Sequence, residues 1–308
     1  MKKNILITGG AGNLGGSLTR KLVEDKNNFV VVMDNLLTGD IAKLPTNKTE
    51  NFIFYESDVN SYNELSKIFK EYHFDLVFHY AAIVGVERTL KNPLMVLDDI
   101  EGMKNILQLS MENNISRFFY SSSSEVYGEP VEIPQNEVST PLNSRLPYAV
   151  VKNLGELYCK SYKQMFDLDY TIMRFFNTYG PLQSEDFVMA KFLNQAIKND
   201  DITINGDGLQ TRTFLYVDDN VDLIIKLIDE SKCLNEIINV GSDEEITIID
   251  LAKIIIKLTG STSKIIHLPP LEEGDMTRRK PDILKMNSIL NKEIINLESG
   301  IKKYLNYL

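Results

Sequence analysis

The chain has 308 residues, of which 43% are hydrophobic and 25% charged, as expected of a globular protein with one large or two small domains. Its net charge of −10 argues against a general nucleic-acid or membrane-surface binder, and no apolar run reaches membrane-spanning length. Two cysteines, three scattered histidines and no signal-peptide pattern predict a protein of the reducing cytoplasm, without disulfides or a metal site.

The opening stretch predicts a buried strand over residues 5–7, a glycine-rich turn, and a helix with leucines at helical spacing. Gly9, Gly12 and Gly15 have the spacing of a dinucleotide-binding fingerprint, and Gly10 begins a second, overlapping one. Such glycines allow a tight turn, close approach of the backbone to a pyrophosphate, and close packing of helix on strand. The free N–H groups at the helix start favour phosphate binding, so we expect a bound dinucleotide.

A second strand over residues 29–33 ends in Asp34, which lies 19 residues after Gly15. At that position a carboxylate binds ribose hydroxyls, and without a neighbouring arginine it favours NAD over NADP. A third strand, residues 52–55, leads to Asp58 and Val59, which we expect beside the adenine. Asp58 could also be a helix N-cap, because apolar residues follow it at helical spacing, and the two roles are compatible.

Residues 75–79 form a fourth expected strand, followed by Ala81 and Ala82, whose small size lets a cofactor lie against the backbone. We interpret His79, at the end of this strand, as a packed residue and not as a catalyst. A long amphipathic helix is predicted from Pro93, and a strand over residues 117–121 runs into four consecutive serines.

The next helix begins at Pro147, and a sixth strand covers residues 169–175. This alternation of apolar strands and helices predicts an α/β fold: a Rossmann-type, doubly wound parallel sheet covered on both faces. After Asn177 the pattern loosens. Helices are expected over residues 187–198, 218–229 and 246–258 and in the C-terminal tail, with strands at 202–204 and 236–240. Two isoleucines at 265–266 lead to a pair of prolines, and a charged segment follows at 272–282.

We therefore divide the chain into an NAD-binding Rossmann domain, residues 1–176, and a smaller C-terminal α/β region, residues 177–308, that mainly binds substrate. Residues of about 213–240 are expected to return to the first domain. The C-terminal region should cap the carboxyl edge of the sheet, where such folds bind their ligands.

Tyr148 and Lys152 have i, i+4 spacing and therefore share one face of a helix. A phenol with a pKa near 10 is a poor base at neutral pH. A nearby ammonium group and a cationic nicotinamide would lower that pKa, so that Tyr148 could take a proton from a carbinol while hydride leaves its carbon. A hydroxyl of the serine run could hydrogen-bond the same substrate oxygen.

With these motifs together, the chain resembles the extended short-chain dehydrogenases/reductases of the nucleotide-sugar epimerase/dehydratase family over nearly its whole length. Later stretches also match the family. They are Arg174-Phe175-Phe176-Asn177-Thr178-Tyr179-Gly180-Pro181, Gly206-Asp207-Gly208-Leu209-Gln210-Thr211-Arg212 and Arg278-Arg279-Lys280-Pro281-Asp282.

The resemblance implies a role for each matching residue. Around the cofactor, NAD, it places Gly9, Gly12, Asn13, Leu14, Gly15, Asp34, Asp58, Val59, Ala81, Ala82, Tyr148 and Lys152. Tyr148 would be the base, Lys152 would orient the nicotinamide ribose, and Ser123 would be the hydroxyl partner, with Glu125 as a further catalytic candidate. Substrate contacts would come from Ser123, Ser124, Glu125, Asn177, Arg212 and Arg279; arginine suits the diphosphate because its fork donates two bonds.

Some positions depart from the family pattern. Asn13 and Leu14 replace an aromatic–isoleucine pair, and Asp98 and Asp99 stand where the family often has asparagine. Ser124 occupies the place of the acid of nucleotide-sugar dehydratases, which weakens water elimination. Glu125 together with Arg279 is similar to nucleotide-sugar decarboxylases, although the arginine that usually follows their lysine is replaced by Asn153. Glu125 could equally be a structural carboxylate.

The function implied is NAD-dependent oxidation at C4 of a GDP- or UDP-linked sugar through a 4-keto species, by a 4-epimerase or a net 4-dehydrogenase. Alternatives are a UDP-glucuronate-type decarboxylase and a 4,6-dehydratase, and, outside enzymes, a sensor or scaffold that binds NAD. By resemblance we expect a homodimer or higher homo-oligomer, paired through the helix from about Pro93 and the helix that carries Tyr148. Leu154 and Leu157 fit that pairing, but core packing would explain them equally well.

Overall fold

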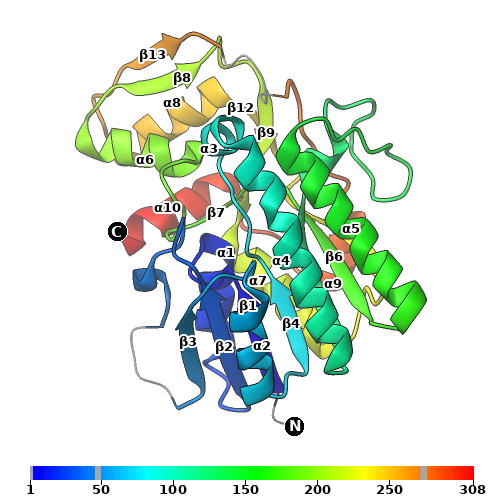
Figure 1. Ribbon diagram of the computed structural model, residues 1–308. Coiled ribbons are helices and arrows are strands. Elements are labelled where there is room, and N and C mark those ends of the chain that lie inside the picture. The colour runs from blue at the N-terminus through cyan, green and yellow to red at the C-terminus, as the bar shows by residue number, and fades with distance from the viewer. Residues whose placement is uncertain (1–2, 46–49, 271–275) are drawn as a thin grey trace.

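A seven-stranded parallel β-sheet forms the centre of the molecule (Figure 1). The computed structural model describes residues 3–45, 50–270 and 276–308. From edge to edge the strands are β11 (Glu236–Val240), β6 (Tyr170–Phe175), β5 (Arg117–Ser123), β4 (Leu76–His79), β1 (Lys3–Thr8), β2 (Asn28–Asp34) and β3 (Phe52–Glu56). The predicted Rossmann-type fold is confirmed.

Helices cover both faces of this sheet. One face packs against α2 (Tyr62–Glu71), α4 (Pro93–Glu112) and α5 (Pro147–Phe166). The other packs against α1 (Asn13–Leu22), α7 (Val217–Asp229) and α9 (Leu284–Leu290). Because both faces are covered, the central strands are apolar throughout, and Ile5, Leu6 and Ile7 are fully buried. Both helices expected to begin at a proline, α4 and α5, have that proline in their first turn.

The strand order reverses at β1, since β2 and β3 lie on one side of it and β4, β5 and β6 on the other. In doubly wound sheets a ligand-binding crevice opens where the order reverses, outside the carboxyl ends of the strands. The sheet therefore directs the ends of β1, β2, β4 and β5 toward one place. Short segments follow three of these strands: η1 (Ile41–Lys43), α3 (Val86–Lys91) and η2 (Ser124–Tyr127).

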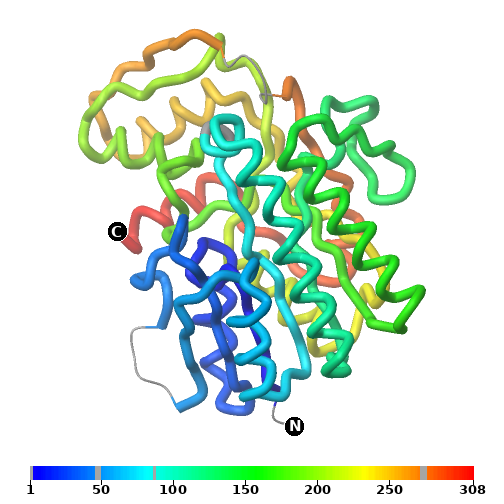
Figure 2. Tube along the Cα trace, in the orientation of Figure 1, coloured from blue at the N-terminus to red at the C-terminus, as the bar shows by residue number. Residues whose placement is uncertain are grey.

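A smaller α/β region lies over this carboxyl edge (Figure 1). It contains α6 (Val188–Lys198), α8 (Ile248–Thr259), α10 (Leu297–Tyr307) and three two-stranded sheets. The strand pairs are β7 (Thr178–Tyr179) with β10 (Leu215–Tyr216), β9 (Thr211–Thr213) with β12 (Glu245–Thr247), and β8 (Ile202–Asn205) with β13 (Ile265–Leu268). Between β10 and β12 the chain returns to the central sheet, where β11 pairs with β6. This path can be traced along the tube in Figure 2.

The helix predicted over residues 246–258 begins later, so that part of the prediction is wrong. Ile246 and Thr247 instead belong to β12, which pairs antiparallel with β9. The Thr247 side chain caps α8 by accepting a hydrogen bond from the Asp250 N–H at 3.1 Å. A run of β-branched residues suits a strand once a partner strand is present, and periodicity alone does not reveal that partner.

Part of the charged segment predicted at 272–282 lies outside the described residues. Within the ranges that the structure describes, no helix combines the length and hydrophobicity needed to cross a membrane.

Candidate functional site

A cavity of about 1150 Å³ opens at the carboxyl ends of the central strands, beneath the smaller region. The structure brings every residue of the predicted site to the wall of this cavity. They are Gly9, Gly12, Asn13, Leu14, Gly15, Asp34, Asp58, Val59, Ala81, Ala82, Ser123, Ser124, Glu125, Tyr148, Lys152, Asn177, Arg212 and Arg279.

The glycine turn after β1 leaves no room for side chains. Gly9 has φ +70°, and a Cβ there would lie 2.4 Å from the Ala81 nitrogen. A Cβ on Gly15 would lie 2.4 Å from the Gly9 carbonyl oxygen. Gly12 precedes α1 and makes no side-chain cap, so the first N–H groups of the helix face the cavity without such a partner. Together with the helix dipole, these donors suit the pyrophosphate of a dinucleotide.

Asp34 is held rigidly at the end of β2. Its Oδ2 accepts a hydrogen bond from the Ala11 N–H at 2.9 Å, and its Oδ1 accepts one from the Leu36 N–H at 2.8 Å. A carboxylate fixed in this way retains lone pairs for a diol, as the ribose of NAD requires. This carboxylate beside the glycine turn fits the predicted cofactor.

The second role considered for Asp58, that of a helix N-cap, is wrong. The N-cap of α2 is Ser61, while Asp58 accepts hydrogen bonds from the Asn60 N–H at 2.9 Å and the Asn35 side chain at 3.1 Å. These contacts hold the loop after β3 against the cavity, with Val59 beside it.

His79 is packed, as predicted, and is not among the cavity residues. Its Nδ1 lies 2.7 Å from Thr8 Oγ1, and its ring stacks on Tyr120. Burial lowers the pKa of His79 to about 3, so the ring stays neutral at physiological pH.

Sequence reasoning missed Lys43, a half-buried cation of η1 that lines the cavity with Asp34. Burial lowers the pKa of Lys43, opposed by the nearby carboxylates of Asp40 and Asp34. Lys43 lies in a loop without periodicity, nine residues after Asp34, and only the fold of that loop brings the two together.

The candidate catalytic side chains meet where α5 crosses the end of β5. Tyr148 and Ser123 both line the cavity, and the Ser123 hydroxyl lies near enough to the Tyr148 phenol to lower its pKa. Lys152 Nζ lies 5.7 Å from the centre of the Tyr148 ring and donates to the Ser121 carbonyl oxygen at 2.7 Å. The helix thus presents a phenol and an ammonium group to the serine that ends the strand.

The pKa of Tyr148 differs from the expectation of a lowered value. Burial raises this pKa, the carboxylate of Glu125 raises it further, and the nearby hydroxyl of Ser123 acts in the opposite direction. Burial lowers the pKa of Lys152 to about 8, against the attraction of Asp99. The predicted lowering also counted the positive charge of a nicotinamide ring, and the protein side chains alone do not produce it.

Glu125 and Arg279 form an ion pair in the cavity wall, with Arg279 Nη2 2.8 Å from Glu125 Oε1. The Nε atom of Arg279 is buried and has no hydrogen-bond partner among the described residues. A buried guanidinium with a spare donor suits an anionic or hydroxylated ligand.

Arg212 is buried too, and its Nη1 donates to the carbonyl oxygens of Thr211 and Met276, both at 2.8 Å. The Asn177 amide donates to the Thr213 carbonyl oxygen at 3.1 Å.

Asp99, noted above as a departure from the family, is a carboxylate within the cavity. Its Oδ2 accepts a hydrogen bond from the Ile83 N–H at 2.8 Å. Burial raises the pKa of Asp99 to about 6, and the charge of Lys152 lowers it in part. Over residues 3–45, 50–270 and 276–308 there is no group of three or more His, Cys, Asp or Glu side chains arranged to hold a metal ion.

Comparison with known proteins adds to this geometry. The model of the NAD dependent epimerase/dehydratase family matches residues 5–241. A UDP-N-acetyl-alpha-D-glucosaminuronate decarboxylase of Bacillus cytotoxicus is 34% identical over all of this chain and 98% of its own length. A putative UDP-glucose 4-epimerase of Methanocaldococcus jannaschii is 35% identical over 99% and 98% of the two chains. The solved structure of UDP-glucose 4-epimerase from Thermotoga maritima with UDP-glucose superposes with a TM-score of 0.92, at 31% identity, over 99% of this chain and 98% of the other.

Proposed function

Because the chain belongs to the NAD dependent epimerase/dehydratase family, we propose that it oxidises C4 of a UDP-linked sugar and inverts that centre, as a 4-epimerase. The observation that carries the proposal is the placement of Tyr148, Ser123 and Lys152 together in the cavity wall, with Lys152 Nζ 5.7 Å from the centre of the Tyr148 ring. A phenol, a hydroxyl and an ammonium group gathered in this way are suited to moving a proton to and from a sugar hydroxyl.

Each side chain has a distinct task in this proposal. Bound NAD supplies the hydride acceptor and a positive charge near the phenol. Tyr148 takes the proton of the C4 hydroxyl, and Ser123 holds the same oxygen by a hydrogen bond. Lys152 stabilises the phenolate and holds the nicotinamide ribose. The glycine turn holds the pyrophosphate, Asp34 the adenosine ribose, and Asp58 and Val59 the adenine.

For the substrate, we propose that Arg212, Arg279 and Asn177 lie along the diphosphate and the sugar. Residues 177–308 then mainly bind the nucleotide sugar, while residues 1–176, with 213–240, carry the cofactor. UDP is preferred over GDP in this proposal because the relatives described above carry UDP in their names. The buried free thiols of Cys159 and Cys233 agree with a cytoplasmic enzyme.

A second candidate function is decarboxylation of a UDP-linked uronic acid. The Glu125–Arg279 ion pair favours it, because an arginine with a free buried donor can hold a C6 carboxylate. One relative at 34% identity also bears a decarboxylase name. Release of the 4-keto product, a net 4-dehydrogenation, is a further outcome of the same first step, whereas Ser124 in the place of an acid argues against dehydration.

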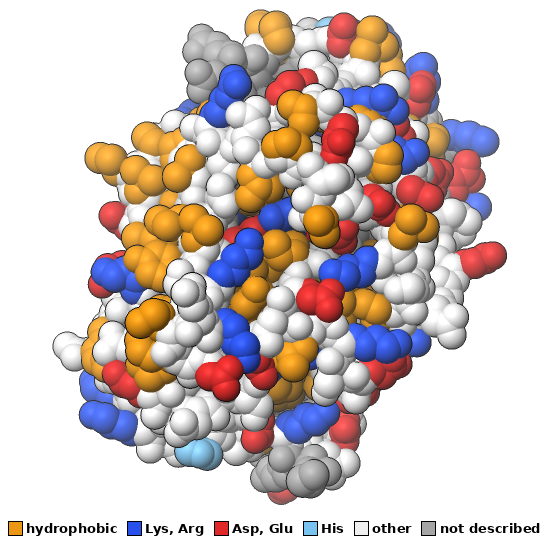
Figure 3. Space-filling view, turned by 90° about the vertical axis from the view of Figure 1, so that its right-hand side faces the viewer, with side chains coloured by type: hydrophobic (Ala, Val, Ile, Leu, Met, Phe, Trp, Pro, Cys, Tyr) orange, Lys and Arg blue, Asp and Glu red, His pale blue; other side chains and the backbone are white. Residues whose placement is uncertain are grey.

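A homodimer formed through α4 and α5 is also part of the proposal. Both helices expose apolar side chains that core packing does not use: Leu94, Met95, Leu97, Val150, Leu154 and Leu157. Leu157 is 53% exposed, so the core-packing explanation given for it above does not apply. Figure 3 shows the side of the molecule on which α5 lies, with hydrophobic side chains open to solvent among charged ones. Burying such a surface against a second copy is favourable.

The test uses three incubations, each of which contains the protein, NAD and one sugar nucleotide: UDP-glucose, UDP-N-acetylglucosamine or UDP-glucuronate. NMR follows C4 and C6 of the sugar in each. Inversion at C4 supports the 4-epimerase, loss of C6 the decarboxylase, and accumulation of a ketone the net dehydrogenase. Tyr148→Phe must abolish turnover while the variant still binds NAD. Full activity in that variant refutes the assignment, and tight NAD binding without turnover of any sugar supports the sensor alternative.

A further inference from the structure

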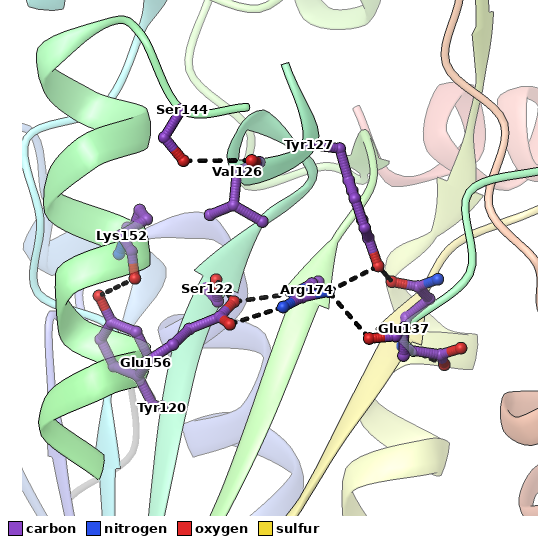
Figure 4. Close-up of polar contacts among 10 residues, drawn as sticks. Tyr120, Ser122, Val126, Tyr127, Glu137, Ser144, Lys152, Glu156 and Arg174 are labelled. Atoms are coloured by element: carbon purple, nitrogen blue, oxygen red, sulfur yellow. Dashed lines mark hydrogen bonds and ion pairs between the residues drawn. The ribbon is translucent and has the colours of Figure 1, made fainter. Parts of the chain in front are cut away.

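A buried ion pair begins one helical turn after Lys152 in α5 (Figure 4). Glu156 on α5 and Arg174 on β6 are 1% and 2% exposed. Arg174 donates to both carboxylate oxygens of Glu156, from Nε at 2.8 Å and from Nη2 at 2.7 Å. This two-pronged contact fixes the orientation of both side chains. No step of the proposed reaction uses either residue.

The ion pair joins the catalytic helix α5 to β6, and Glu156 also joins this helix to β5, the strand that carries Ser123. Glu156 Oε1 also accepts a hydrogen bond from the Ser122 hydroxyl at 2.6 Å. One turn earlier in α5, the Lys152 carbonyl oxygen accepts from the Tyr120 hydroxyl at 3.4 Å. At Gly155 a Cβ would lie 2.1 Å from that hydroxyl oxygen, so helix and strand are in direct contact here. The position of α5 along β5 is thereby fixed at the turn that follows Tyr148 and Lys152.

The other end of Arg174 leads toward the segments that carry Glu125 and Arg279. Its Nη1 donates to the Tyr127 hydroxyl at 2.9 Å, and Tyr127 donates to Asn239 Oδ1 at 2.8 Å. The Asn239 amide in turn donates to the Gln135 carbonyl oxygen at 2.8 Å.

Gln135 lies beside the segment that contains Arg279. Its N–H donates to the Lys280 carbonyl oxygen at 2.8 Å, and its carbonyl oxygen accepts from the Asp282 N–H at 2.8 Å. Tyr127 belongs to η2, the same short helix as Glu125. Both partners of the Glu125–Arg279 ion pair are therefore attached to the chain of contacts that begins at Glu156.

We infer that Glu156 and Arg174 are positioning residues, which hold Tyr148 and Lys152 in a fixed relation to Glu125 and Arg279. The two charges face each other at contact distance and largely cancel at the catalytic groups, so the pair acts through geometry. Neither residue touches substrate in this inference. A displacement of about 1 Å at a catalytic group can cost about a hundredfold in rate, so loss of this support should be visible in turnover.

The experiment compares Glu156→Gln with Arg117→Met. Arg117 is a matched control because it is also a buried arginine, at the amino end of β5, where it donates to Thr171 Oγ1 and to the Leu227 carbonyl oxygen, both at 2.8 Å. Each variant should unfold at a lower temperature than the natural protein. Glu156→Gln should lower kcat by about a hundredfold with less than a threefold change in KM, and should speed hydrogen exchange within residues 147–158 and 121–127. Arg117→Met should leave kcat within about threefold.

A double variant, Glu156→Leu with Arg174→Met, separates positioning from stability. Apolar replacement of a buried ion pair often restores stability, so this variant should unfold near the natural temperature and still turn over slowly. Natural kcat in Glu156→Gln or in the double variant, or an equal loss of kcat in Arg117→Met, would overturn the inference.

The turnover measurement rests on the proposed function. If the natural protein turns over none of the sugars, the proposed function fails, and hydrogen exchange alone decides this inference. Local loosening confined to the two segments in Glu156→Gln then supports the inference, and unchanged exchange overturns it.

Discussion

The guanidinium of Arg279 and the carboxylate of Glu125 form an ion pair of 2.8 Å that joins two segments more than 150 residues apart in sequence. Arg279 is 7% exposed and Glu125 15%, so the pair is only weakly screened by solvent. Glu125, the acidic residue of the pair, also acts on Tyr148, because its charge raises the pKa of that phenol. The ion pair therefore connects the proposed substrate-binding wall to the proposed base.

Replacing Glu125 by Gln should lower the pKa of Tyr148. The variant removes a negative charge that disfavours the phenolate and leaves the positive charge of Arg279, which favours it. The ascending limb of kcat/KM against pH, which reports ionisation of the base, should shift to lower pH. A full pH profile of the natural protein and of Glu125→Gln measures this, with the exposed Glu112→Gln as control. An unshifted limb would show that Glu125 does not act on Tyr148.

Asp99→Asn should stabilise the protein at neutral pH. Because the pKa of Asp99 rises from 3.8 to about 6 on folding, the folded state binds more protons between these values and stability falls as pH increases. Asparagine avoids the cost of burying the charge, so a gain of about 1–3 kcal/mol is expected above pH 6. The gain should disappear below about pH 4, where Asp99 is protonated in both states.

Urea unfolding at pH 4 and pH 7 measures the effect of Asp99→Asn, with Asp98→Asn, its exposed neighbour, as the control. The same gain at both pH values would contradict the assignment to a buried charge.

Asp34→Asn should weaken the preference for NAD over NADP. The natural carboxylate repels a 2′-phosphate and accepts hydrogen bonds from the ribose diol. The amide removes the repulsion, so the dissociation constant of NADP divided by that of NAD should fall by roughly tenfold. Calorimetric titration of both cofactors measures this ratio. Asp40→Asn is the control, since this exposed acid of the same loop caps η1 by accepting from the Ala42 N–H at 2.9 Å; a similar change there would argue against a specific role of Asp34.

Gly9→Ala should be far more damaging than Gly260→Ala. Both glycines have positive φ, +70° and +65°, so each substitution carries a backbone cost of about 1 kcal/mol. At Gly9 the added Cβ also meets the Ala81 backbone at 2.4 Å, whereas at Gly260 it meets no described atom within 4 Å beyond the adjacent residues. The expected result is loss of NAD binding in Gly9→Ala and none in Gly260→Ala, measured by thermal shift with NAD. Equal NAD binding in both variants would contradict the tight turn.

The order of the central elements could be predicted from the sequence because each strand and helix there carries a strong local signal. The apolar run before Gly9 and the prolines at positions 93 and 147 are examples, and the elements they predict occur in the structure. The short strands of the C-terminal region could not be predicted in this way. Thr178–Tyr179 forms a strand only because Leu215–Tyr216 lies beside it, and two residues are too few for a periodic pattern.

The residues of the candidate site could be found because they occur in motifs with fixed spacing, and all of them line one cavity. Their charge states could not be predicted, because burial of Tyr148, Lys152 and Asp99 shifts their pKa values and burial depends on the whole fold. The cavity residue Lys43 was missed for the same reason.

By itself, the sequence determined the dinucleotide turn, the doubly wound sheet and the i, i+4 pairing of Tyr148 with Lys152, since backbone geometry links neighbouring residues directly. Only the tertiary structure decided that Glu125 meets Arg279 and that Glu156 meets Arg174. Such contacts depend on which faces of distant segments are buried against each other, and neither periodicity nor motif spacing encodes that relation.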